Sequence, residues 1–457
     1  MAVCLLLLAV CILVMGLDDL FIGTVYLWTA REDFPWPADE ELRRAPERRI
    51  AILVPLWQEH RVISRMLDYN LSTIRYSNYE IFAGVYPNDP LTALAVGNAA
   101  ADHSNIHLAH VGHSGPTSKG DCLNAAWHEM ERFEKRHGRR FDIVVTHDAE
   151  DLIHPESLRL ISWFSRKYEM VQVPVLPLAT GAALTHGVYC DEFAEYQSKD
   201  IPVRQRLNGF VPANGVGTGF DREVLARLGN LRDGRVFDPD ALTEDYEAGF
   251  HFHALGYRQL FVPVRFDATG PVATREYFPS TLRTAVRQRS RWVAGIALQG
   301  WQRHGWRVPW KQRYWFWRDR KGLIGNLLAP VANLLFLCGA IGGPLLWPPW
   351  VLGAMFCISV AQIALRMKCA ARIYGPRFAA GVPVRAVWGN VLNCLATLVA
   401  LHQFVDAQMK STGLRWRKTE HAFPDFTPAG RVAYSATNGA ITRSNSLSLQ
   451  DVNRTPR

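Results

Sequence analysis

Charged side chains and paired cysteines are both scarce in this sequence. Charged residues make up 20% of the chain, against roughly 25% in typical soluble domains, and the apolar residues are unevenly distributed. The 8 cysteines are dispersed without any Cys-x-x-Cys pair, so we expect buried thiols rather than a disulfide framework or a cysteine zinc site. The chain also lacks the basic start and cleavage site of a signal peptide, so residues 1–29 are expected to remain as a membrane helix.

The length and the charge narrow the class of protein. A chain of 457 residues can hold one large domain or two ordinary ones, which is more than a simple binding module needs. The net charge of +9 and the pI near 9.2 suit nucleic acid, anionic lipid or a phosphorylated substrate. Because the arginines cluster beside apolar runs, we expect membrane lipid and no nucleic acid as a partner.

Four apolar stretches approach the length of about 20 residues that a membrane helix needs. They cover residues 1–29, 323–347, 349–366 and 386–405. Asp18 and Asp19 interrupt the first stretch and should face other helices, water or an interface. Basic residues follow the first stretch and precede the second, so the intervening domain is expected on the cytoplasmic side of a multi-pass protein.

The fourth apolar stretch, residues 386–405, differs from the others because it contains polar side chains such as Asn393 and Gln403. A full crossing would also place the basic segment from Lys410 to Lys418 outside. We therefore expect this stretch to be re-entrant or to lie on the membrane.

These boundaries divide the chain into four parts. We expect a transmembrane helix at 1–30, a domain at 31–320 that ends in tryptophan-rich interfacial helices, a membrane region at 321–410, and a basic tail at 411–457 that is largely disordered.

Strand-like and helix-like stretches alternate within residues 31–320. Aliphatic runs at 49–55, 81–85, 105–109 and 142–146 are typical of strands, and residues 60–73 and 119–135 have helical periodicity. This alternation predicts an α/β fold with a mostly parallel sheet covered on both faces. Ligands are then expected at the carboxyl ends of the strands.

The residues that follow the expected strands are acidic. Glu59 follows the first strand, Asp89 the second, and Asp148, Glu150 and Asp151 the fourth. Three carboxylates so close together repel one another unless a cation or water separates them. A solvated acidic turn is the simpler reading, but the preceding strand favours a site for Mg²⁺ or Mn²⁺ bound together with a diphosphate.

A second acidic pair, Glu244 and Asp245, follows Thr243 and a glycine-rich segment at 214–220. Thr243 as a helix N-cap, with acids in the first turn, would stabilise a helix by about 0.5 to 2 kcal/mol without any catalytic role. The glycines would let the backbone approach a substrate closely, although such a segment alone is weak evidence of a site.

A third motif begins at Gln288. In a helix, Gln288, Arg291 and Trp292 share one face, so an amide, a guanidinium and an indole can contact an anionic, flat ligand together. Any such segment can equally be a structural packing face. Its position after the two acidic clusters favours a binding role.

Taken in order, these motifs resemble family 2 glycosyltransferases of the cellulose and hyaluronan synthase type. The resemblance spans residues 49–300 and rests on Asp89, Asp148-Ala-Glu150, Gly217-Thr218-Gly219, Thr243-Glu244-Asp245, Gln288-x-x-Arg291-Trp292 and a lysine segment that starts at Lys119. The extended pattern is similar to the bacterial phage adsorption protein B family, including the segment Trp416–Pro424. The resemblance implies a GT-A (Rossmann-like) fold in the bacterial inner membrane and an inverting transfer from a nucleotide sugar, with a UDP-sugar as the expected donor.

The same resemblance implies roles for individual residues. Asp245 would be the catalytic base and Glu244 would position the acceptor or support that base. The nucleotide-sugar would be bound by Glu59, Asp89, Lys119, Asp148, Gln288 and Arg291, the metal by Asp148 and Glu150, and the acceptor by Trp292 and Gly217, Thr218 and Gly219. Glu150 stands where a second aspartate is usual in the family.

Three functions remain open from the sequence. The first is synthesis of a polysaccharide on a glycan acceptor, with an export or outer-membrane partner. The others are single addition to a lipid-linked acceptor and a catalytically silent membrane scaffold. The histidines, including His251 and His253, are expected at ordinary positions because their spacing lacks a second set of ligands.

Overall fold

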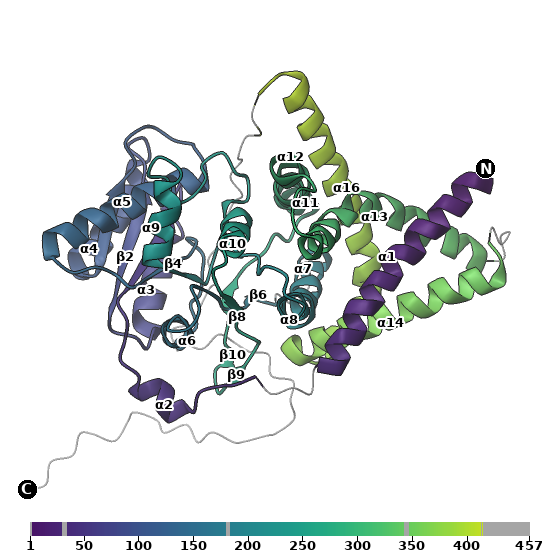
Figure 1. Ribbon diagram of the computed structural model, residues 1–457, viewed down its shortest axis with the longest axis horizontal. Coiled ribbons are helices and arrows are strands. Elements are labelled where there is room, and N and C mark those ends of the chain that lie inside the picture. Colours follow the sequence, from purple (N-terminus) through teal and green to yellow (C-terminus); the bar gives the residue numbers. More distant parts are fainter. Residues whose placement is uncertain (1, 30–33, 180–182, 342–346, 413, 415–457) are drawn as a thin grey trace, which may run out of the picture. The chain divides into compact units, whose positions relative to one another are not determined.

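A mixed seven-stranded sheet forms the centre of the α/β domain (Figure 1). The computed structural model describes residues 2–29, 34–179, 183–341, 347–412 and 414, so the expectations for the tail at 411–457 lie almost entirely outside the described residues. The sheet strands are β1 (Ile50–Pro55), β2 (Tyr79–Val85), β3 (Ile106–His110), β4 (Ile143–Thr146), β5 (Met170–Gln172), β7 (Thr218–Asp221) and β8 (Gln259–Phe261).

The order of strands is β3-β2-β1-β4-β7-β5-β8. The first four, which the sequence predicted, are parallel, and Ile52 of β1 lies opposite Ile81 of β2 and Val145 of β4. Strand β7 is antiparallel to both β4 and β5. Two small sheets join β6 (Val175–Pro177) to β11 (Thr274–Glu276), and β9 (Phe266–Asp267) to β10 (Gly270–Pro271).

The same part of the chain contains short and medium helices. They are α2 (Asp39–Arg44), α3 (Ile63–Thr73), α4 (Pro90–Asp102), α5 (Lys119–His137), α6 (Ser157–Phe164), α7 (Leu184–Glu195), α8 (Ile201–Arg206), α9 (Arg222–Asn230), α10 (Glu244–Ala254), α11 (Leu282–Trp292) and α12 (Gly300–His304). Two π-helical segments, η1 (Tyr196–Asp200) and η2 (Val293–Gln299), continue α7 and α11.

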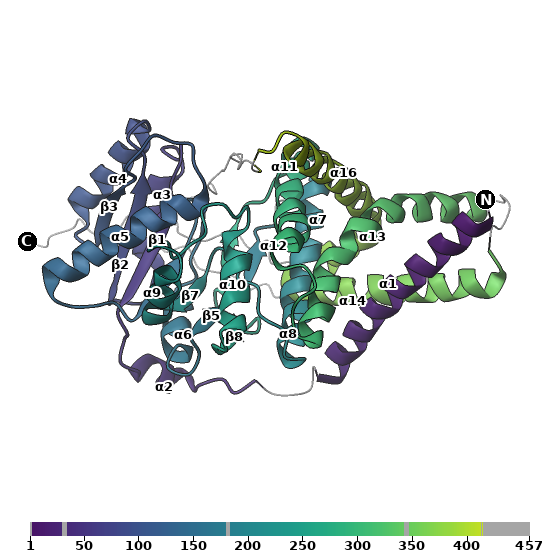
Figure 2. The same ribbon diagram turned by 45° about the horizontal axis from the view of Figure 1, so that its top comes forward.

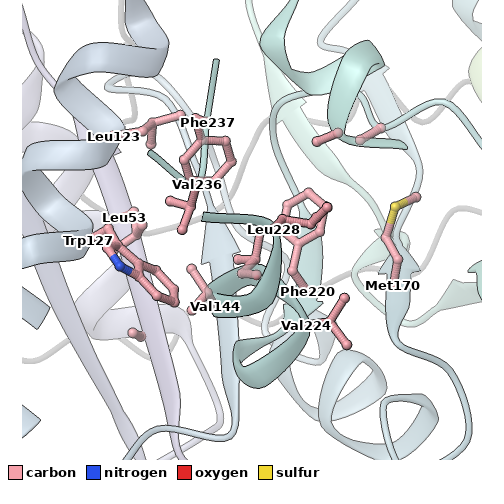
Figure 3. Packing of buried hydrophobic residues seen from close by; sticks show 14 of the residues in the cluster. Leu53, Leu123, Trp127, Val144, Met170, Phe220, Val224, Leu228, Val236 and Phe237 are labelled. Atoms are coloured by element: carbon pink, nitrogen blue, oxygen red, sulfur yellow. The ribbon is translucent and has the colours of Figure 1, made fainter. Parts of the chain in front are cut away.

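The main hydrophobic core lies between the sheet and helices α5 and α9 (Figure 3). Trp127 of α5 packs in the same cluster as Leu53 of β1 and Val144 of β4, and Val224 of α9 lies near Phe220 of β7. All are buried, as expected for strands covered by helices. This rigid core fixes the edge of the sheet at which the polar residues collect.

Four helices among the described residues are long and apolar enough to cross a membrane: α1 (Ala2–Thr29), α13 (Trp310–Ala340), α14 (Pro349–Tyr374) and α16 (Val382–Met409). Short helix α15 (Pro376–Ala379) precedes α16. Helices α1, α13 and α14 extend together away from the sheet, whereas α16 runs at a steep angle to α14 (Figures 1 and 2). Helix α13 runs unbroken through residues 320 and 321, so the expected domain boundary falls inside a helix.

Candidate active site

The carboxyl ends of β1, β2 and β4 meet at one edge of the sheet because these strands are parallel neighbours. Glu59 follows β1, and Asp148 and Glu150 follow β4. Glu150 and Asp151 are both buried, so the acidic segment after β4 is not the solvated turn that was the simpler reading of the sequence.

Lys119, the first residue of α5, joins this edge to the second acidic pair. Its Nζ lies 2.7 Å from Oδ1 of Asp148 and donates a hydrogen bond to the carbonyl oxygen of Gly215 at 3.3 Å. Gly215 has a φ of +77°, and a Cβ there would lie 2.7 Å from Oδ2 of Asp245. The glycine therefore allows Lys119, Asp148 and Asp245 to gather around one backbone turn.

Glu244 and Asp245 form the first turn of α10. Burial, together with the neighbouring Asp245 carboxylate, raises the pKa of Glu244 to about 7, and burial also raises the pKa of Asp245. Burial alone would lower the pKa of Lys119, but Asp148, Glu244 and Asp245 outweigh it and raise the pKa of the ammonium above its ordinary value. A carboxylate whose pKa is raised toward neutral pH is a stronger base and is better suited to accept a proton from a hydroxyl.

Thr243 occupies the N-cap position of α10 but makes no capping hydrogen bond with its side chain. Its side chain instead lies against Gly295 of η2. A Cβ added at Gly295 would lie 2.7 Å from both Cγ2 and Oγ1 of Thr243. The expected position of Thr243 at the start of the helix, with acids in the first turn, is therefore confirmed, but the capping hydrogen bond of its side chain is not formed. The segment is fitted against the helical run that carries Arg291.

Glu276, the last residue of β11, is a further cavity residue, and the sequence did not indicate it. Burial raises the pKa of Glu276 well above its ordinary value, and the carboxylates of Asp151, Glu150 and Asp148 add to the shift. No periodic pattern marks it, since β11 is a three-residue strand. The pairing of β11 with β6 brings this carboxyl to the cavity.

The acidic groups fit a divalent cation by their chemistry. Asp148, Glu150 and Glu276 line one cavity, and Lys119 forms an ion pair with Asp148. Carboxylate oxygens are the ligands that Mg²⁺ and Mn²⁺ prefer, and a bound diphosphate commonly completes their coordination. The concentration of buried negative charge is the observation that favours a cation here.

Behind these ligands, Asp151 is fully buried and accepts hydrogen bonds from the backbone N–H of Asp148 (2.9 Å) and from Nδ1 of His147 (2.7 Å). Asp151 therefore shapes the turn after β4.

Helix α11 brings the third motif to the same cavity, which Gln288, Arg291 and Trp292 line together. Oε1 of Gln288 and Nε of Arg291 are buried and have no hydrogen-bond partner among the described residues. A buried polar atom without a hydrogen-bond partner lowers the stability of the fold unless a ligand supplies that partner. The intervening Arg289 points elsewhere and contacts Glu192 and Asn393 at 2.5 and 2.7 Å.

Aromatic rings form another wall of the cavity. The Trp292 indole is tilted relative to the Phe193 ring, with the ring centroids 6.1 Å apart, and lies edge-on to the Phe278 ring at 6.4 Å. All three residues line the cavity. Flat apolar faces of this kind suit the carbon-hydrogen face of a sugar ring.

The cavity has a volume of about 450 Å³ and a smaller neighbour of about 70 Å³. The smaller cavity is lined by Glu59, Tyr86 and Trp57, and it shares Lys119, Asp148 and Arg291 with the larger one. The two cavities therefore meet at Lys119, Asp148 and Arg291.

A third cavity, of about 260 Å³, continues the large one toward the apolar helices. Both are lined by Glu195, Tyr196, Asp200, Asp319 and Arg366. Asp19 of α1 and Gln362 of α14 also line the third cavity. A passage lined by charged residues therefore connects the acidic centre with the apolar helices α1 and α14.

Four residues assigned from the sequence do not line these cavities. Asp89 instead accepts backbone hydrogen bonds from Gln58 (2.6 Å) and Thr92 (3.4 Å) and thereby holds the loop after β1. Thr218 is buried and donates to Oε1 of Gln172 at 2.6 Å. Gly217 and Gly219 are closely packed: a Cβ added at Gly217 would lie within 2.5 Å of Thr274, and one added at Gly219 within 2.5 Å of Ile161. Their geometry supports a positioning role and offers no surface to an acceptor.

Comparison with known proteins places these features in a family. The family described as "Glycosyltransferase like family 2" matches residues 46–295. The bacteriophage adsorption protein B of Escherichia coli K12 is 36% identical over 462 residues, which cover 92% of this chain and 62% of that protein. The bacteriophage N4 adsorption protein B of Escherichia coli O157:H7 matches to the same extent. This chain thus spans less than two thirds of the length of these relatives.

Among solved structures, a mannosyltransferase from Pyrobaculum calidifontis in complex with GDP-Man and Mn²⁺ is similar, with a TM-score of 0.50 and 17% identity. The match covers 84% of this chain and 99% of that one. The expected GT-A type of fold is confirmed, with the antiparallel β7 as an addition to the expected parallel strands.

Proposed function

The chain belongs to glycosyltransferase like family 2, and we propose that it transfers a sugar from a nucleotide diphosphate sugar to a hydroxyl of a growing glycan. The observation that carries this proposal is the convergence of Asp148, Asp245 and Arg291 on one cavity. UDP-sugars are the first donors to test.

In this proposal the chain binds the donor diphosphate through Lys119, Arg291 and Gln288. A planar guanidinium suits phosphate oxygens, and the unpartnered Nε of Arg291 gains an acceptor on binding. Mg²⁺ or Mn²⁺, held by Asp148 and Glu150, would neutralise charge on the leaving nucleotide. Lys119 then shifts its hydrogen bonding from Asp148 toward the phosphates.

Asp245 is the proposed base. Its carboxylate accepts the proton of the acceptor hydroxyl while that oxygen attacks the anomeric carbon opposite the leaving diphosphate, which inverts the configuration. Glu244, which is buried, supports the base from the adjacent position.

The acceptor is proposed to be a glycan that extends over Trp292 into the passage toward α1 and α14. The side chains around the third cavity balance in charge: the acids are Asp19, Glu195, Asp200 and Asp319, and the bases are Lys199, Arg204, Arg318 and Arg366. Such a lining offers many hydrogen bonds but no net charge for an anion. It favours a neutral, hydroxyl-rich chain over a lipid phosphate.

The location is proposed to be the bacterial inner membrane, with the catalytic region in the cytoplasm and α1, α13 and α14 spanning the bilayer. Helix α16 is proposed to lie at the interface. Arg385 of α16 pairs with Asp191 of α7 at 2.6 Å, and Asn393 contacts Glu192 of α7 at 3.1 Å. These contacts keep α16 against the catalytic region, where a charged residue costs less than in hydrocarbon.

The test uses the full chain in lipid nanodiscs with Mn²⁺ and a panel of nucleotide sugars, and it measures release of the nucleotide. We expect release with at least one donor and its loss in Asp245→Asn. Asp233→Asn, which alters a carboxylate with 95% side-chain exposure, is the matched control and should keep full activity.

No release with any donor would favour a silent scaffold and overturn the proposal. Release that survives Asp245→Asn would remove Asp245 from the role of base. The length of the product then separates a growing glycan from a single addition.

A further inference from the structure

Three potential metal ligands converge on one side of helix α10, away from the proposed diphosphate site. Glu247 and His251 lie one helical turn apart on α10, and His304 ends α12. Oε2 of Glu247 is 2.7 Å from Nε2 of His304 and 3.5 Å from Nε2 of His251. One ligand atom from each residue lies within 4.8 Å of the others.

The surrounding structure holds these side chains in place. The His304 ring lies 4.6 Å from the Phe250 ring and is stacked on Phe316 at 6.0 Å. Arg320 donates to the carbonyl oxygen of Gly305 at 2.7 Å, which fixes the end of α12. The nearby Arg303 forms an ion pair with Asp238 at 2.6 Å, so its charge is compensated.

Two imidazole nitrogens and one carboxylate oxygen form a ligand set that suits Zn²⁺ or a related transition metal better than Mg²⁺. Ligand atoms about 2.0–2.2 Å from a tetrahedral zinc ion are separated by roughly 3.3–3.6 Å. The separation between Glu247 and His251 already matches this value, and the hydrogen bond between Glu247 and His304 must open slightly. Three protein ligands leave a fourth position for water.

We propose that Glu247, His251 and His304 bind a zinc ion that ties α10 to α12. Helix α10 begins with Glu244 and Asp245, and α12 follows the helical run that contains Arg291 and Trp292. The ion would therefore fix the element that carries the proposed base relative to the element that carries the proposed diphosphate ligand. It is separate from the Mg²⁺ or Mn²⁺ at Asp148 and Glu150, and its binding can be measured without any donor sugar.

The test removes metal from the full-length protein with a chelator and then measures zinc binding by equilibrium dialysis. Absorption of the Co²⁺-substituted protein reports nitrogen ligation in a four-coordinate site. We expect about one ion per chain in the wild type and an affinity lower by at least about tenfold in both His251→Ala and His304→Ala.

Two controls separate this site from others. His253→Ala changes a histidine on the same helix that contacts Gln312 instead, and Asp148→Asn changes the proposed Mg²⁺ or Mn²⁺ site. Both should keep zinc binding at the level of the wild type.

The melting temperature adds a second readout, because a ligand of the folded state stabilises it. Zinc should raise the melting temperature of the wild type and leave that of His304→Ala unchanged. The proposal is overturned if the wild type binds no zinc and shows no Co²⁺ spectrum, which would make the cluster a hydrogen-bonded contact only. It is also overturned if both histidine variants bind zinc like the wild type.

Discussion

At the scale of residues, Gly215 shows how one missing side chain organises the proposed centre. Its φ is positive, and a Cβ at this position would lie only 2.7 Å from Oδ2 of Asp245, so there is no room for a larger residue. The carbonyl oxygen of Gly215 also accepts the hydrogen bond from Lys119. The spacing between base and diphosphate ligands therefore depends on this backbone turn.

Gly215→Ala should reduce kcat/KM by on the order of a hundredfold, because small displacements of a catalytic group are that costly. The matched control is Gly256→Ala, which has a φ of +83° but open space around the position of Cβ. Both variants should lose about 1–2 kcal/mol of stability from the left-handed backbone. Equal nucleotide release by the two variants would show that the contact with Asp245 has no catalytic importance.

The raised pKa values of Glu244 and Asp245 predict the pH dependence of the free enzyme. Because Asp245 must be ionised to act as the base and burial raises its pKa, the acid limb of kcat/KM should lie above the pH range in which an ordinary aspartate titrates, and Glu244, with a pKa of about 7, titrates beside it. Stability changes with pH in the opposite direction. The pKa of Glu244 is raised from 4.5 to about 7 in the folded state, so its contribution to the free energy of unfolding is largest below pH 4.5, is lost as the pH rises to about 7, and changes no further above that pH.

Rates of nucleotide release across the pH range check this prediction. Glu244→Gln removes one of the two titrating carboxyls, and the acid limb should move to lower pH. A wild-type profile that is flat from about pH 5 to pH 8 would contradict the assignment.

Several cavity residues could be located from the sequence, and others could not, for a clear reason. Glu59, Asp148 and Glu150 could be found because each follows a recognisable parallel strand. Glu276 and Phe193 could not, since a three-residue strand and the end of α7 reach the cavity only through tertiary packing.

At the scale of elements, charged contacts connect α1 to α13. Arg318 and Lys321 of α13 both contact Asp18, and Lys321 also lies 2.5 Å from Asp19. The sequence predicted that these aspartates must face other groups, and the structure confirms it. Their partners could not be named beforehand because they lie about 300 residues away in the chain.

Arg318→Leu should lower the free energy of unfolding, by up to roughly 3–5 kcal/mol, because Asp18, Asp19 and Asp200 all lose the guanidinium and Lys321 is the cation that remains beside Asp18 and Asp19. Arg44→Leu, which removes an exposed pair with Glu40, should change it by less than about 1 kcal/mol. Thermal unfolding in the same detergent measures both. Similar melting temperatures for the two variants would show that Lys321 alone compensates Asp18 and Asp19.

The sequence was less informative about β7. Its Thr-Gly-Phe-Asp segment has no β-branched run, and its place between β4 and β5 is set by packing of Gly219 against Ile161. The four parallel strands were recognisable because burial on both faces demands continuous aliphatic sequence.

At the scale of the whole molecule, the placement of α16 distinguishes a proposed topology with three membrane crossings from one with four. Composition alone allows it to cross, but its contacts with α7 and α11 favour an interfacial position. Polar residues within the stretch gave the same expectation from sequence. Hydropathy could not decide the matter, since it does not record the helices against which an apolar face packs.

A compartment-sensitive reporter joined after Met409 should report the same side of the membrane as one joined after Gly375. Both should be cytoplasmic if α16 lies at the interface. A reporter after Met409 that becomes active only outside would show a fourth crossing. A reporter joined after Ile341, at the end of α13, is the control and should lie on the opposite side from Gly375.

The ion pairs of η1 and its neighbour Glu195 carry one more consequence. Glu195 contacts Arg366 of α14, and Asp200 contacts Arg318 of α13, so the catalytic region and its anchors share salt bridges. A chimera that replaces only α13 and α14 with the helices of another transferase would remove these two guanidinium groups and leave Lys199 as the cation beside Glu195 and Asp200. A variant that lacks the long apolar helices, made for study without detergent, should therefore also carry substitutions in η1.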